Sequence, residues 1–193
     1  ALNDSDPHVR REAIRLAERF LKQPASPAVS ALADALLQRA DDPSLIVRAQ
    51  LALSLGEWRS PRAGEILGQL AVQHLNQPRF RAAVLSSAGH HVSGILAAVM
   101  RAPETKPGRA DWIAPLISTA AAAGDETTLA MALAAVLPAD GQPPRAAQFT
   151  ALVALLEAAD RKQETLGDWL SRDETLREAG LRLGQAFAAA RRL

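Results

Sequence analysis

Cysteine and tyrosine are both absent from the 193 residues of this chain. Without cysteine, the segment has no disulfides, thiolate metal ligands, cysteine nucleophiles or covalently attached c-type haem. Aromatic residues make up only 4% of the sequence, so alanine and leucine carry much of its apolar character. These two residues are the strongest apolar helix formers, and no clear alternating run of strand formers is present. The composition therefore predicts an all-α protein.

An excess of one charge and long apolar runs are also lacking. The chain has 22 basic and 21 acidic residues and a net charge of +1. This balance gives no overall field to attract nucleic acid or an anionic membrane. No stretch of about 18 apolar residues suggests a membrane span, and no signal segment opens the chain. We therefore expect no membrane insertion, and we do not expect nucleic acid as a partner.

Three stretches in the first half of the chain align with one another on an arginine. They are residues 4–21, 41–58 and 75–91. The shared arginines are Arg10, Arg48 and Arg81, spaced 38 and then 33 residues apart. Apolar or small residues follow each arginine three and seven positions later. A period in this range is typical of stacked helical repeats.

Each repeat contains a second helix with its own start signal. Ser-Pro begins residues 26–40 and 60–74, and an acid with proline precedes the first two arginine helices. A hydroxyl or carboxylate caps free N–H groups, and proline presets the first turn. The pattern predicts helix, tight turn and helix, repeated. The first helix has no predecessor and the opening residues lack methionine, so we expect a fragment of a larger protein.

The second half carries a weaker repeat. Residues 101–112 hold two prolines and a glycine among mixed charges, so we predict an irregular connection over 102–110 and a candidate hinge. Start signals predict further helices over residues 111–124, 125–137, 143–160, 164–171 and 172–193, with an irregular turn at 138–144. We therefore predict a single domain, 1–193, with clear repeats over 1–101 and divergent ones over 111–193.

The repeated pattern resembles that of the HEAT repeat family. The stretches that carry the resemblance are "DPHVRREA" and "DPSLIVRAQLA". In addition, "VRAQLALSLGEW" and "RFRAAVLSSAGHH" look like the HEAT-like region of large multidomain proteins from planctomycetes and related bacteria. In those proteins the region lies between a β-propeller resembling sugar dehydrogenases and a cytochrome-c-like domain with a CxxCH motif. The resemblance covers residues 2–101 well and the remainder loosely.

The resemblance implies a right-handed α-α superhelix of about ten helices. It also implies a role as a spacer and docking platform for flanking domains, in the periplasm or cell envelope. The chain contains neither the propeller nor the CxxCH motif, so the redox chemistry of those proteins is carried onto no residue here. We accordingly expect no cofactor in this segment.

A structural role explains the shared arginines Arg10, Arg48 and Arg81. We expect them to form a ladder of pairs with the acidic turns of adjacent repeats. The expected partners are Asp4 and Asp6 below, and Asp41 and Asp42 above. The third repeat has Asn76 and Gln77 in place of the acids, so the ladder should weaken there. The alternative is an arginine row that binds an anionic ligand.

Three tryptophans, Trp58, Trp112 and Trp169, are the few large aromatic residues. They are candidate contacts for a protein partner or a stacked base. Trp58 ends a helix expected to be buried, and the other two lie within periodic apolar patterns. Packing in the core or between repeats is therefore the structural alternative.

Other eye-catching pairs do not indicate a reaction. His90 and His91 are adjacent, so on a helix they point about 100° apart and cannot both grip one metal ion. Ser86 and Ser87 lie near them without a G-x-S-x-G elbow or an evident acid partner. The acid pairs Asp41-Asp42, Asp125-Glu126 and Asp173-Glu174 lie where helix caps belong. We therefore predict no catalytic, metal or cofactor residue.

The sequence favours a non-catalytic scaffold whose partners are protein domains, chiefly those that flank it in its parent. The missing catalytic constellations and the helical repeat both point that way. The main alternative is a nucleic-acid-binding HEAT-like protein of the DNA-glycosylase type, which would need a basic concave face with a carboxylate at its centre. A chromophore-lyase-like repeat protein is a third alternative, for which no residue argues.

Overall fold

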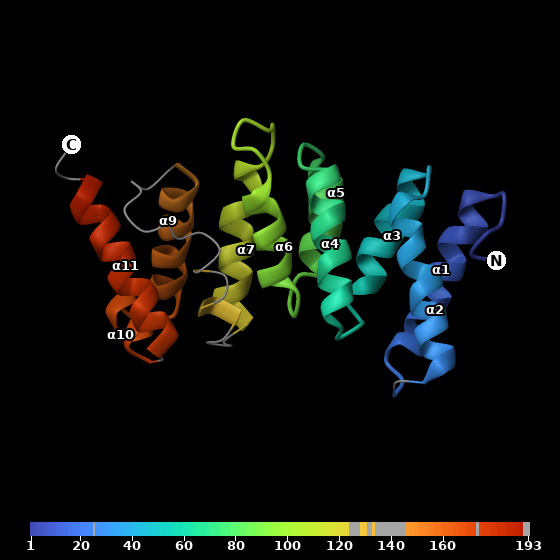
Figure 1. The fold of residues 1–193 in the computed structure, drawn as a ribbon, viewed down its shortest axis with the longest axis horizontal. Helices are drawn as coiled ribbons and strands as arrows, with labels where there is room; N and C mark the ends of the chain where they lie inside the picture. The colour runs from blue at the N-terminus through green and yellow to red at the C-terminus, as the bar shows by residue number, and fades with distance from the viewer. Residues whose placement is uncertain (25, 124–127, 131–132, 134–145, 173, 191–193) are drawn as a thin grey trace.

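The chain folds into an elongated series of helices, with the first and last described helices at opposite ends (Figure 1). The computed structural model describes residues 1–193 except 25, 124–127, 131–132, 134–145, 173 and 191–193. Within the described residues every regular element is a helix, ten α-helices and one 3-10 helix. The predicted all-α class is therefore confirmed.

The first half contains seven of these elements. They are α1 (Pro7–Leu21), α2 (Pro27–Leu37), the 3-10 helix η1 (Gln38–Asp41), α3 (Leu45–Leu55), α4 (Pro61–Gln73), α5 (Pro78–Ser86) and α6 (Val92–Arg101). No separate helix was predicted over the residues of α6. The second half contains α7 (Ala110–Ala123), α9 (Ala146–Arg161), α10 (Leu166–Ser171) and α11 (Glu174–Ala190). The helix expected at 125–137 lies largely, and the turn at 138–144 wholly, outside the described residues.

The helix starts follow from capping residues that stand before prolines. Asp6 accepts a hydrogen bond from the backbone N–H of His8 at the start of α1, at 2.7 Å. Ser26 and Ser60 cap α2 and α4 in the same way. Each cap satisfies an N–H group that the first helical turn leaves free. The local sequence therefore determines where these three helices begin.

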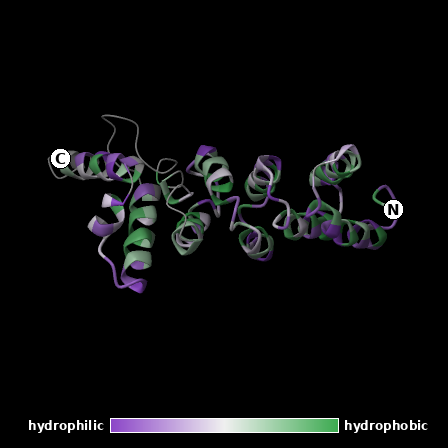
Figure 2. Ribbon diagram, turned by 90° about the horizontal axis from the view of Figure 1, so that it is seen from below, coloured by the Kyte–Doolittle hydropathy of each residue, from purple (hydrophilic) through white to green (hydrophobic). Residues whose placement is uncertain are grey.

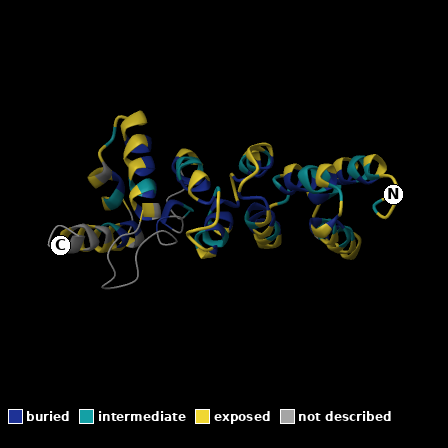
Figure 3. Cartoon of the chain, turned by 90° about the horizontal axis from the view of Figure 1, so that it is seen from above, coloured by how far each residue is buried: buried dark blue, intermediate teal, exposed yellow. Residues whose placement is uncertain are grey.

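The helices form two layers with the core between them. Along one layer α1 packs against α3, α3 against α5, and α5 against α7, while α4 packs against α6 in the other. Figure 3 shows the buried positions of the two rows facing one another, and most helices carry both apolar and polar residues around their circumference (Figure 2). Val47, Leu51 and Leu55 of α3 are fully buried. An apolar helix such as α3 is stable in water because neighbours cover it on several sides.

The predicted irregular connection runs between the end of α6 and the start of α7. Its buried Arg109 donates to the carbonyls of Val99 and Met100 at 3.0 Å each. Lys106 donates to the carbonyl of Val72 in α4 at 3.3 Å. Gly108 has a φ of 81° and lies directly against the carbonyl of Leu75. These contacts tie the connection to α4 and α6.

Among the described residues, no helix has the length and apolar character needed to cross a membrane.

Candidate functional site

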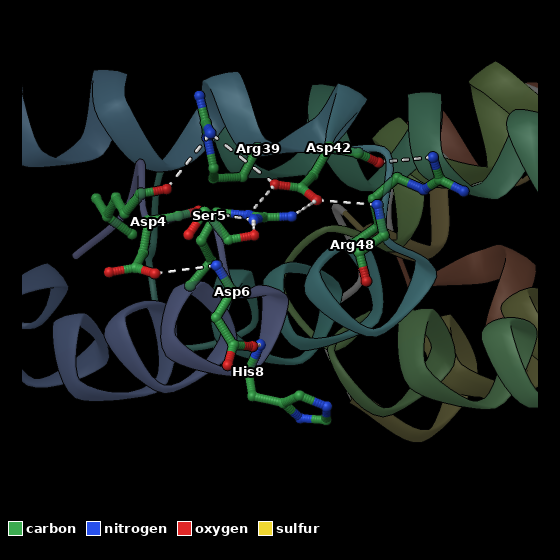
Figure 4. A network of polar contacts seen from close by, with 10 residues as sticks. Asp4, Ser5, Asp6, His8, Arg39, Asp42 and Arg48 are labelled. Carbon is green, nitrogen blue, oxygen red and sulfur yellow. Dashed lines mark hydrogen bonds and ion pairs between the residues drawn. The ribbon is translucent and has the colours of Figure 1, made fainter.

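The Arg10 guanidinium forms a bidentate pair with Asp42 of the next repeat. Its Nε and Nη2 atoms donate to the two carboxylate oxygens of Asp42 at 2.8 Å each. Its Nη1 atom donates to the carbonyls of Asp4 and Ser5, at 2.7 and 3.0 Å. Asp42 is labelled in Figure 4, and the guanidinium of Arg39 lies 3.9 Å from its carboxylate. One arginine thus joins the N-terminal segment, α1 and the entrance of α3.

Asp42 is ionised at neutral pH despite being 3% exposed. Burial raises the pKa of its carboxyl, but hydrogen bonds from Arg10 and from the Ser44 N–H, with the charges of Arg10 and Arg39, outweigh burial and hold this pKa below its usual value. Asp42 was expected to cap α3. Instead α3 begins at Leu45, and its N-cap residue, Ser44, forms no side-chain cap. The Asp42 carboxylate accepts from the backbone N–H of Ser44 at 2.9 Å.

The other two arginines of the predicted ladder find different partners. Arg48 donates to the carbonyl of Asp42 at 2.8 Å, where a carboxylate pair was expected. Arg81 pairs with Asp111, which lies at the start of α7, at a distance of 2.9 Å. This partner was not predicted. Arg10 and Arg81 therefore each pair with a carboxylate. Arg48, which lies between them in the sequence, bonds to a backbone carbonyl.

The remaining acids of the predicted ladder serve local geometry instead. The Asp4 carboxylate accepts from the Asp6 N–H at 2.9 Å, and Asp6 caps α1. Asp41 accepts long hydrogen bonds from Gln69 and Gln73 of α4, at 3.4 and 3.3 Å. None of these three carboxylates pairs with an arginine of the ladder within the described residues, which corrects that part of the prediction.

Two of the three tryptophans are buried, and the indole N–H of each donates a hydrogen bond. Trp112 is fully buried, and its indole N–H donates to the carbonyl of Leu75 at 3.0 Å. Trp169 is 2% exposed and donates to the carboxylate of Glu164. Neither ring is accessible to a partner, so the prediction of partner contacts at these two positions is corrected in favour of core packing.

Trp58 differs from the other two tryptophans. Its ring is half-buried against the core and lies in the turn between α3 and α4. No described residue accepts a hydrogen bond from its indole N–H. Trp58 is therefore the one predicted partner contact that keeps both an accessible aromatic face and a free donor.

Trp58 lines a depression of about 550 Å³ that we call the Trp58 depression. The end of α1, the start of α2, the turn after α3 and the start of α4 all contribute to it. Its apolar floor includes Leu21 and Val29, and its cations are Lys22, Arg59 and Arg62. Concave sites that combine an apolar surface with a few convergent polar groups are the usual places for ligand contact. This depression is the candidate functional site.

The rim of the Trp58 depression is partly held by ion pairs. Lys22 pairs with Glu57 at 2.7 Å, which ties the end of α1 to the α3–α4 turn. Arg62 pairs with Asp34 of α2 at 2.5 Å, and its guanidinium lies 6.0 Å from the centre of the Trp58 ring.

A neighbouring depression of about 570 Å³ brings Ser86, Ser87 and His90 together, and it is also lined by Glu18 and Glu57. We call it the Glu18 depression. The hydroxyl of Ser86 donates to the Ala83 carbonyl at 2.8 Å, and that of Ser87 to the Leu53 carbonyl at 3.0 Å. Because each hydroxyl proton is directed at a carbonyl, neither serine forms a pair with a histidine base. In the described part of the chain, moreover, no group of three metal-binding side chains is present.

Two buried histidines are held neutral by their surroundings. Burial, followed by the positive charge of Arg48, lowers the pKa of His74, which also packs against Phe80 with ring centres 4.1 Å apart. Burial, followed by neighbouring His90, lowers the pKa of His91, against the opposing effect of the Trp58 and Leu55 carbonyls. His91 lies in the turn before α6 and is 5% exposed.

These two histidines predict a loss of stability on acidification. In the unfolded chain they bind protons near pH 6.5, whereas in the fold their pKa values are lower. The unfolded state therefore binds more protons below about pH 6.5, so the free energy of unfolding falls as the pH is lowered from there. Urea denaturation at pH 7.5 and 5.5 measures the effect. A His74→Gln/His91→Gln double variant should show a smaller difference between the two pH values, and an unchanged difference would contradict the assignment.

Comparison with known proteins adds little to this geometry. Protein-family models give no match, and neither do curated proteins. Among solved structures, the chain is similar to a crystal structure of an engineered protein, with 16% sequence identity, 97% of this chain and 94% of that chain covered, and a TM-score of 0.41. A likeness at that score carries no argument, so function must be argued from the residues themselves.

Proposed function

We propose that this chain is a non-catalytic, HEAT-like scaffold that contacts protein domains, chiefly those that flank it in a larger bacterial protein. The observation that carries the proposal is Trp58, whose ring is accessible while its indole N–H has no described acceptor. Tryptophan is enriched among the residues that dominate protein–protein binding energy. The other two tryptophans are buried in the core, which leaves Trp58 as the tryptophan that is accessible to a partner.

Two further features support a scaffold. The helices follow one another in an extended stack in which each contacts its near neighbours, and such a stack presents a long surface at fixed spacing. The resemblance of residues 2–101 to the HEAT-like region of planctomycete-type dehydrogenase and haem-binding proteins suggests what is held: redox or sugar-active domains in the cell envelope. In that arrangement the chain sets the distance between its neighbours, and chemistry belongs to them.

Capture experiments test the proposal directly. The chain is immobilised and exposed to lysate, to envelope extract and to the separately produced flanking domains of its parent, with and without nuclease. We expect recovery of a protein domain that is insensitive to nuclease and at least about tenfold weaker for Trp58→Ala, as expected when an interface anchor is removed. The Leu16→Ala variant is the matched control, because Leu16 is 56% exposed on α1 and lies outside the depression.

Three outcomes would contradict the scaffold proposal. One is turnover of any substrate by the isolated chain. A second is recovery of nucleic acid that is lost at moderate salt, which would favour the DNA-glycosylase-like alternative. The third is that Trp58→Ala and Leu16→Ala weaken capture equally, which would show that the partner does not bind at the Trp58 depression.

A further inference from the structure

The Trp58 depression has two strong hydrogen-bond donors that are free. The indole N–H of Trp58 and the guanidinium of Arg59 have no partner among the described residues, and both line the depression. The carboxylate of Glu57, by contrast, is already paired with Lys22. A ligand that satisfies this surface must therefore supply acceptors, and charged acceptors form the stronger hydrogen bonds with a guanidinium.

Charge leads to the same conclusion. Lys22, Arg59 and Arg62 line the depression together with Glu57. Because Lys22 is paired with Glu57 and Arg62 with Asp34, the local excess is one positive charge, that of Arg59. The pairs of Lys22 with Glu57 and of Arg62 with Asp34 are both exposed, and exposed pairs exchange partners at little cost. A carboxylate entering the depression thus meets Arg59 first and two further cations at the rim.

The apolar part of the surface calls for a second group on the same ligand. Leu21 and Val29 line the depression together with Trp58, and burial of one aliphatic or aromatic side chain against them is favourable. An amino-acid side chain adjacent to a carboxylate provides both groups within a short distance. A linear peptide segment meets these requirements.

We propose that the Trp58 depression binds a short acidic peptide segment, with a carboxylate on Arg59 and the Trp58 indole N–H and an apolar side chain against Leu21 and Val29. The inference rests on the proposed function and specifies its partner. The expected occupant is an exposed acidic segment of a neighbouring protein domain.

A nucleic acid fits the surroundings less well. The adjoining Glu18 depression shares Glu57 with this one and adds the carboxylate of Glu18. A polyanion continuing from the Trp58 depression toward α5 would meet these acids, whereas nucleic-acid grooves follow the backbone with successive cations. A short segment in the Trp58 depression ends before reaching Glu18.

Selection from a phage-displayed library of random heptapeptides tests the inference. The whole chain is the target, and Arg59→Glu is selected in parallel. Arg79→Glu is the matched control, since Arg79 is exposed on α5 and outside the depression. We expect the wild-type chain and Arg79→Glu to enrich the same sequences, with Asp or Glu at least threefold over the input next to a large apolar residue. Arg59→Glu should lose that enrichment and bind a selected peptide at least tenfold more weakly.

The inference is overturned if no sequence is enriched, if the selected sequences lack acids, or if Arg59→Glu and Arg79→Glu select alike. It is also overturned if a single-stranded oligonucleotide displaces the selected peptides and binds with the same dependence on Arg59. If the selection fails while Trp58→Ala still abolishes capture of a domain, the scaffold function stands and only the acidic specificity is wrong. If both fail, the Trp58 depression is not a contact surface.

Discussion

Replacing Trp112 with alanine is expected to lower the free energy of unfolding by about 4 kcal/mol, the cost typical of deleting a fully buried tryptophan side chain. The Trp112 ring is entirely enclosed, and its indole N–H satisfies the carbonyl of Leu75. The variant both opens a cavity and leaves that carbonyl without its donor. Urea denaturation followed by far-UV circular dichroism measures the loss.

The Trp112→Phe variant separates the two effects. It keeps most of the aromatic volume but has no N–H, so we expect a loss of about 1–3 kcal/mol from the unsatisfied carbonyl and a smaller void. A Trp112→Ala variant that loses less than about 1 kcal/mol would show that the ring is not part of the core.

The second large effect is expected at Asp42. The Asp42→Ala variant leaves the Arg10 guanidinium without its bidentate carboxylate partner, and breaking a buried pair in this way costs about 3 kcal/mol. The matched control is Asp41→Ala, one residue away, because Asp41 is exposed and accepts only two long bonds from glutamines. We expect that control to stay within about 0.5 kcal/mol of the unsubstituted chain.

A double variant, Arg10→Met/Asp42→Leu, distinguishes loss of a pair from loss of packing. Removing both charges eliminates the unpaired one, so the double variant should be more stable than Asp42→Ala. If instead it is less stable than Asp42→Ala, the hydrogen bonds of Arg10 to the Asp4 and Ser5 carbonyls contribute more to stability than its pair with Asp42. Equal losses in Asp41→Ala and Asp42→Ala would contradict the assignment of Asp42.

The sequence predicted those parts of the fold that depend on local chemistry. Ser26 and Ser60 with the prolines that follow them start α2 and α4, since a cap acts on N–H groups only two or three residues away. The pairing of Arg10 with an acid of the next repeat also follows from the period, because stacking puts equal positions of adjacent repeats side by side. The choice of Asp42 over Asp41 does not follow, since it depends on which carboxylate faces inward.

The pairing of Arg81 with Asp111 was not predicted, for a specific reason. The fourth repeat places Trp112, 32 residues after Phe80, at the apolar position that precedes each shared arginine. Ile113 therefore replaces the arginine, and the acid that serves Arg81 is Asp111, just before the tryptophan. Aligning the fourth repeat on its apolar stripe, with no arginine required, is the signal that could have found this pair.

The candidate site was predicted only in part, because exposure of a tryptophan is a property of its neighbours in space. Trp58 follows the apolar helix α3 and Trp112 lies in the apolar helix α7, yet one borders a depression and the other is enclosed in the core. Arg59 and Arg62 are three residues apart, whereas Lys22 comes from the end of α1. No spacing in the sequence brings Lys22 and Trp58 together, so the sequence could indicate only part of the donor-rich surface.

The arrangement of contacts between successive helices has a consequence for how the molecule comes apart. In the described part of the chain, extensive contacts join elements that are close in order, such as α1 with α3 and α4 with α6. Among the described helices, no packed interface joins the first to the last, so heat or tension can melt one end of the stack while the opposite end keeps its shape. The stack would then lengthen in steps, one helix pair at a time.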